Sequence, residues 1–194
     1  MTASDTRQTI LDVAQATVAR KGWAAVGINE VLTAAGVPKG SFYHWFSSKD
    51  AFGEAMLRSY FTTYLAEMDA LFARPGVPAA ERLMAYWRNW RDDQGIGDCQ
   101  GKCLAVKLGA EVADLSEPMR LALKEGTTAI IDRIQRMIEA GASDGSLDAG
   151  GDAREVAETL YEMWVGASVL AKIRRDPGPL DSALAATSRI LRLA

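Results

Sequence analysis

The sequence has few of the residue types that build metal sites and disulfides, and no hydrophobic run long enough to cross a membrane. Its 194 residues include two cysteines and one histidine. Cys99 and Cys103 lie four positions apart, which gives a poor disulfide framework, and with His44 they supply too few soft ligands for a zinc site. No apolar stretch approaches the roughly 18 residues of a membrane-spanning helix. We therefore expect no metal, no cofactor and no membrane partner.

Features of an exported protein are absent as well. The chain begins with the sequence MTASDTR, which contains no apolar stretch like that of a signal peptide. Two closely spaced cysteines also agree with a reducing compartment. We expect the chain to act in the cytoplasm.

The chain also lacks the sustained alternation of apolar and polar residues that marks half-buried strands, whereas apolar residues recur at helical spacing almost throughout. We therefore expect an all-α fold. Ser4 or Asp5 can cap a first helix that stops at Gly22, and Ser47 with Asp50 resembles a capping box before the fourth helix. After the first helix, the expected helices cover about 28–35, 38–45, 48–72, 79–93, 100–114, 117–141, 152–174 and 180–192.

Neither sign of charge dominates, since the formal net charge is −3. The first 60 residues hold six basic and five acidic residues, whereas the other 134 hold sixteen basic and twenty acidic residues. The N-terminal part is therefore not strongly basic, as many nucleic-acid-binding domains are. Any affinity for DNA must come from the positions of Arg7, Lys39 and Lys49 and from the doubling of the site in a dimer.

The most informative segment covers residues 28–46, with the sequence INEVLTAAGVPKGSFYHWF. It has the layout of two short helices around a tight turn, with small and polar side chains that can enter a major groove on the second helix. Phe42, Trp45 and Phe46 are expected to pack inward. The candidate DNA-binding residues on this helix and at the start of the next are Lys39, Gly40, Ser41, Tyr43, His44 and Lys49.

The recognition-helix signature of the TetR family of repressors resembles residues 35–52, whose sequence is AGVPKGSFYHWFSSKDAF. This resemblance implies an all-helical homodimer, with an N-terminal three-helix DNA-binding domain at 1–50 and a C-terminal effector-binding and dimerisation domain at 51–194. It also implies that Tyr43 and Lys49 contact phosphate and that Ser41 and His44 lie at the groove. Lys39 is added to the DNA-binding candidates because of its positive charge, not because of the resemblance. For His44, the alternative to DNA contact is that it is an ordinary exposed surface residue.

Residues 99–119 are similar to the corresponding segment of the NemR/AcuR-like branch of that family, whose members respond to reactive electrophiles or acrylate-type molecules. Lys102 is adjacent to Cys103 and Lys107 lies one helical turn further on. Because cationic neighbours lower the pKa of a thiol, we predict a reactive Cys103 that can be alkylated or oxidised. The competing interpretation is that Cys103 is a small buried hydrophobic residue.

Four further residues are candidates for effector binding or sensing. The pattern of the branch would bring Lys172 towards Cys103, although an ordinary solvated lysine is the alternative. Cys99 is four residues before Cys103 and could act as a resolving thiol. Tyr161 and Trp164 could line a small apolar pocket, although aromatic residues at helical spacing more often belong to the core.

Long apolar stripes on two C-terminal helices predict a homodimer, because pairing two copies into a four-helix bundle would bury them. A two-fold dimer places its recognition helices about 34–36 Å apart, one turn of DNA, so the operator should be nearly palindromic. The stripes consist of Ile130, Ile134, Met137, Val156, Leu160, Met163 and Ala167.

These features predict a DNA-binding transcriptional regulator that is not an enzyme. Its partners would be double-stranded operator DNA, a small-molecule or electrophilic inducer, and a second copy of the chain. A cysteine-dependent enzyme is one alternative, but its base would have to be Glu111 or Asp114, since His44 falls in the other predicted domain. A helical interaction module is the other, and it leaves the polar residues on the thin second helix unexplained.

Overall fold

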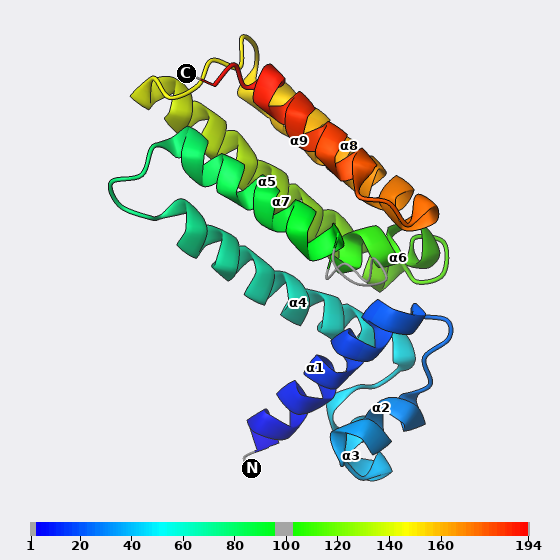
Figure 1. Cartoon of the computed structure of the whole chain (residues 1–194). Helices are drawn as coiled ribbons and strands as arrows, with labels where there is room; N and C mark the ends of the chain where they lie inside the picture. The colour runs from blue at the N-terminus through cyan, green and yellow to red at the C-terminus, as the bar shows by residue number, and fades with distance from the viewer. Residues whose placement is uncertain (1–2, 96–102, 194) are drawn as a thin grey trace. The chain divides into compact units, whose positions relative to one another are not determined.

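The structure, a computed structural model, describes residues 3–95 and 103–193 of the chain. These residues form nine α-helices and no strand (Figure 1), which confirms the predicted all-α class. The helices are α1 (Ala3–Lys21), α2 (Ile28–Ala35), α3 (Lys39–Trp45), α4 (Lys49–Phe72), α5 (Ala79–Gly95), α6 (Leu104–Val112), α7 (Glu117–Asp144), α8 (Ala153–Arg174) and α9 (Gly178–Ile190). The sixth helix is shorter than the predicted 100–114, of which residues 100–102 lie outside the described part.

The chain divides into two compact units. The first comprises Met1–Thr63 and Cys103–Gly126, and the second comprises Tyr64–Lys102 and Thr127–Ala194. Helices α4 and α7 therefore contribute to both units, and α6 belongs with the helix-turn-helix. The boundary predicted at residue 50, between DNA binding and effector binding, concerns function and stays a prediction.

Two of the predicted helix starts are wrong by a few residues. Helix α1 begins at Ala3, so positions 4 and 5 lie inside its first turn and not before it. At the start of α4 the capping side chain is Ser48, one residue after the predicted Ser47, since its hydroxyl oxygen accepts a hydrogen bond from the backbone N–H of Ala51 at 3.0 Å. The first residue of the helix is thus set by the side chain that can accept a hydrogen bond from the third N–H of the helix.

In the first unit, an aromatic cluster anchors α3 from behind. The rings of Phe42, Phe46 and Phe52 lie with centroids 4.9 to 5.3 Å apart, and all three side chains are buried. Burying each one stabilises the fold by about 1.5–3 kcal/mol. Trp45, which was predicted to pack inward, is half-buried. The reason is helical spacing: Trp45 follows Ser41 by four residues and shares its outward face, whereas Phe42 and Phe46 share the inner one.

In the second unit, the core is an aromatic cluster that joins α5 to α8. Trp87, Trp90, Tyr161 and Trp164 are all buried, and the polar atoms of two indoles have buried partners. Trp90 donates its indole N–H to the Ser168 hydroxyl at 2.9 Å, and Trp164 donates to a threonine hydroxyl of α9 at the same distance. Helices α8 and α9 run side by side (Figure 1).

The apolar stripes that predicted a dimer are covered within the chain itself. Ile130, Ile134 and Leu160 are 0% exposed, and Met137 and Ala167 are also buried. For these five residues the prediction of a bundle between two copies is therefore wrong, because the neighbouring helices of one chain already bury them. The other two stripe residues, Val156 and Met163, are half-buried. The large hydrophobic side chains that α8 exposes are instead Val169, Leu170 and Ile173.

Candidate DNA interface and effector site

Helix α3 exposes the polar residues that the sequence predicts for DNA contact. Gly36 adopts a left-handed conformation at the end of α2, with φ +67°, which turns the chain towards α3. Lys39 and His44 are exposed, Tyr43 is 63% exposed, and Ser41 is half-buried. The structure thus brings the candidate residues of α3 together on a short helix whose inner face is held by the phenylalanine cluster.

A shallow groove runs along this exposed face. Its volume is about 370 Å³, and its lining includes Gly40, Ser41, His44 and Trp45, with Thr6 from α1. A Cβ atom added to Gly40 would meet no atom of the chain within 4 Å. Packing within the chain therefore does not require glycine at this position.

The Lys49 side chain is held by an aromatic ring. Its ammonium lies 5.0 Å from the centroid of the Trp23 ring, within range of a cation–π interaction. Trp23 is only 4% exposed and packs against Phe52, with ring centroids 6.1 Å apart. Trp23 was not predicted from the sequence, because no local pattern connects it to a lysine 26 positions later.

Trp23 and Ala24 are in turn bound by a residue of α6. The two carboxylate oxygens of Glu111 accept hydrogen bonds from the backbone N–H groups of Trp23, at 3.1 Å, and Ala24, at 2.6 Å. On the same helix, the Lys107 ammonium donates to the carbonyl oxygen of Arg20 at 3.3 Å. Glu111, one of the two candidate bases of the enzyme alternative, is therefore engaged with the residues that follow α1.

Cys103 lies at the N-terminal cap position of α6 and is 5% exposed. Burial raises the pKa of the Cys103 thiol, while the backbone N–H of Val106 and the Tyr60 hydroxyl act in the opposite direction. The predicted lowering of this pKa is thus wrong, because burial of the thiol outweighs the groups that lower its pKa. Cys99 and Lys102, the other residues of that argument, lie outside the described residues.

The remaining effector candidates belong to the second unit. Tyr161 and Trp164 are part of its aromatic core, with exposures of 5% and 0%, and Lys172 is exposed on α8. Cys103 and Lys107 belong to the first unit. The sensing set that the sequence predicts is therefore shared between the two units.

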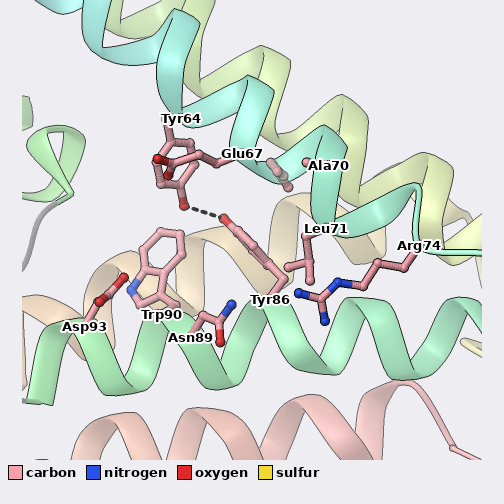
Figure 2. A pocket seen from close by; sticks show the side chains of 10 residues that line it. Tyr64, Glu67, Ala70, Leu71, Arg74, Tyr86, Asn89, Trp90 and Asp93 are labelled. Carbon is pink, nitrogen blue, oxygen red and sulfur yellow. Dashed lines mark hydrogen bonds between the residues drawn. The ribbon is translucent and has the colours of Figure 1, made fainter. Parts of the chain in front are cut away.

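An open pocket in the second unit lies between the second half of α4 and α5 (Figure 2), and its volume is about 380 Å³. The hydroxyl groups of Tyr64 and Tyr86 form a hydrogen bond of 2.9 Å across it. Trp90, which belongs to the aromatic core of the second unit, forms part of the wall of the pocket. The complete lining consists of Tyr64, Glu67, Met68, Ala70, Leu71, Arg74, Tyr86, Asn89, Trp90 and Asp93. This pocket was not predicted from the sequence, because its walls meet only across the turn at 73–78.

The described residues also lack two kinds of feature. Among residues 3–95 and 103–193, no helix has the length and apolar content to span a bilayer. In that same part of the chain, no group of three or more histidine, cysteine, aspartate or glutamate side chains is arranged to hold a metal ion.

The helix-turn-helix, with its polar face exposed and its inner face anchored, defines this protein as a DNA-binding transcriptional regulator. Two family models match the chain: "Bacterial regulatory proteins, tetR family" over residues 10–56, and "Tetracyclin repressor-like, C-terminal domain" over residues 79–187. The chain belongs to the TetR family, which confirms the predicted family and the prediction of a DNA-binding regulator.

Individual relatives cover almost the whole chain. The HTH-type transcriptional repressor NemR of Escherichia coli is 36% identical over 190 residues, which are 98% of this chain and 96% of NemR. The transcriptional regulator AcuR of Cereibacter sphaeroides is 31% identical and covers 93% of this chain and 82% of its own length. The crystal structure of the reduced form of E. coli NemR matches with a TM-score of 0.89 and 37% identity, over 97% of this chain and 98% of that one. These named relatives are regulators, as the sequence predicts for this chain.

Proposed function

We propose that this protein is a cytoplasmic repressor that binds a nearly palindromic operator as a homodimer and releases it in response to an inducer. The observation that carries the proposal is the exposed polar face of α3. Tyr43 and Lys49 would contact phosphate, and Ser41 and His44 would reach the groove. The exposed Lys39 would add a further phosphate contact, and Gly40 would allow close approach.

The exposed apolar residues of α8 support the homodimer. Val169, Leu170 and Ile173 are 41%, 44% and 72% exposed, and they follow one another at helical spacing near the end of the helix. Three neighbouring large apolar side chains in solvent are a typical sign of an interface. A second copy related by a two-fold axis would cover each patch with its counterpart.

Reaction of an electrophile with Cys103 is the mode of induction that we propose first. The thiolate sulfur would add to the β-carbon of an α,β-unsaturated carbonyl compound, forming a C–S bond, and the resulting enolate would take a proton from water. Since Cys103 is 5% exposed, the added group exceeds the space around it and forces the start of α6 to move. The matched structure of a reduced form of NemR supports a thiol-based response. Lys107 and Lys172 remain candidates for assisting it.

A non-covalent inducer in the pocket between α4 and α5 is the second candidate. Its aromatic wall suits a small apolar body, and its hydroxyl and charged groups suit one polar end. Tyr161 and Trp164 would support this wall from behind, because their rings lie 5.8 and 6.1 Å from that of Trp90.

Two experiments test these proposals. The first measures operator binding of Tyr43→Ala and Lys49→Ala at fixed salt, on a DNA duplex that the wild-type chain enriches from a random library. Both variants should bind more weakly, whereas Lys124→Ala, an exposed lysine of α7, should bind normally. Unchanged binding by both would show that α3 and the start of α4 do not contact DNA.

The second experiment separates the two kinds of inducer. N-ethylmaleimide should release DNA from the wild type but not from Cys103→Ser, and mass spectrometry should locate the adduct at Cys103. Acrylate can alkylate a thiol, whereas propionate, its saturated analogue, cannot. Release by propionate that survives in Cys103→Ser and disappears in Leu71→Trp, which fills the pocket, would instead identify the pocket as the inducer site.

A further inference from the structure

The end of α1 is bound to α6 through a carboxylate and two consecutive backbone N–H groups. Glu111 accepts from the N–H of Trp23 and from that of Ala24, and it is half-buried. Hydrogen bonds to a charged acceptor contribute more to stability than neutral ones. Figure 1 shows α6 beside the C-terminal end of α1 within the first unit. This contact joins the segment that begins at Cys103 to the DNA-binding helices.

The backbone at Gly22 makes this contact possible. Gly22 ends α1 with φ +86°, a left-handed conformation that turns the next two N–H groups out of the helix. A Cβ atom at Gly22 would lie 2.9 Å from a carboxylate oxygen of Glu111. Glycine is thus needed both for the turn and for the close approach of the carboxylate.

The same segment fixes the position of a predicted DNA contact. The backbone of Trp23 is held by Glu111, and its ring is fixed against Phe52 and lies under the Lys49 ammonium at 5.0 Å. A shift of α6 that withdraws the carboxylate would release the backbone of Trp23. The ring under Lys49 would then lose the backbone contact that helps to hold it in place.

We propose that Glu111 is a positioning residue that couples the state of α6 to the DNA contact of Lys49. With α6 in place, the carboxylate holds Trp23 and thereby holds the Lys49 ammonium at the height where it meets a phosphate. When an inducer displaces α6, the carboxylate leaves the two N–H groups and Lys49 loses its support. This inference rests on the proposed phosphate contact of Lys49, and it adds a residue and a route to that contact.

The test is a double-mutant cycle on full-length protein with the enriched duplex described above. Glu111→Gln keeps one oxygen acceptor but loses the charge and one of the two hydrogen bonds. It should lower the affinity for DNA about fivefold or more in the wild-type background. In the Lys49→Ala background the same substitution should have almost no further effect, because the residue that it positions is gone.

Salt dependence supplies a second readout. Each lost phosphate contact reduces the slope of log K against log salt by about 0.9, so a dimer that loses one contact per subunit should show a decrease of about 1.8. Glu111→Gln and Lys49→Ala should both show this decrease. Glu125→Gln, which removes an exposed ion pair of Arg58 in the same unit, is the matched control and should leave slope and affinity unchanged.

The possible outcomes separate this inference from the proposed function. If Lys49→Ala leaves affinity and slope unchanged, the phosphate contact itself is wrong. If Lys49→Ala weakens binding and Glu111→Gln does not, the coupling through Glu111 is wrong while DNA binding by Lys49 stands. If Glu111→Gln lowers affinity equally in both backgrounds, with an unchanged slope, it acts through general stability, and the positioning role is overturned.

Discussion

The indole rings of Trp87 and Trp164 stack with their centroids 5.0 Å apart and their planes 14° from parallel, and this contact joins α5 to α8. Both side chains are 0% exposed, and together they form the centre of the core of the second unit. Trp164 is therefore a core residue that does not line the pocket. Trp90 packs against it and does line the pocket, so Trp164 can affect a bound inducer only through Trp90.

Truncation of Trp164 should consequently destabilise the protein strongly. Trp164→Ala leaves a large cavity and deprives the Thr187 hydroxyl of its indole partner, so the free energy of unfolding should fall by about 3–5 kcal/mol. Urea unfolding monitored by circular dichroism measures this loss. Leu71→Trp in the pocket lining serves as the comparison, since its side chain is half-buried and it should change stability far less. A loss below about 1 kcal/mol for Trp164→Ala would contradict the core assignment.

Reactivity of Cys103 should follow the raised pKa of its thiol. The thiolate is the nucleophile, and burial disfavours it, so alkylation at neutral pH should be slower than for a cysteine in an unfolded peptide. Because the pKa lies above its ordinary value, the rate should keep rising with pH through the mildly alkaline range. Stopped-flow alkylation of the Cys99→Ser variant isolates this thiol. A rate that reaches its plateau below about pH 8 would instead indicate a lowered pKa.

The thiol illustrates where sequence reasoning fails. Its charged neighbours along the chain predicted a lowered pKa, whereas burial in the folded chain raises it, and local sequence does not show that burial. The exposed face of α3 was predictable because glycine at position 36 and the helical spacing of Phe42 and Phe46 act locally. Trp45 was placed on the wrong side because of its apolar character, which alone does not identify the face of a seven-residue helix that meets the core.

The two glycines around α3 should respond differently to alanine. Gly40→Ala meets no atom of the chain, so the protein should fold normally while operator affinity falls, because the added methyl group separates α3 from the DNA groove. Gly36→Ala must adopt φ +67°, which should lower the free energy of unfolding by about 1–2 kcal/mol. Thermal melting and DNA titration of both variants give the comparison. Normal operator affinity in Gly40→Ala would show that the DNA does not approach this position closely.

The exposed apolar patch on α8 should be the surface through which two copies of the chain associate. Ile173→Lys and Leu170→Lys place charges at the centre of the proposed interface, where a second copy would have to bury them, so the protein should become monomeric. Size-exclusion chromatography with light scattering measures the mass. Leu115→Lys is the matched control, since Leu115 is a 62% exposed leucine of the first unit and its replacement should leave the dimer intact. Monomers should also lose most of their operator affinity, because the two half-sites are then no longer bound together. A dimer that persists in both α8 variants would place the interface on another surface.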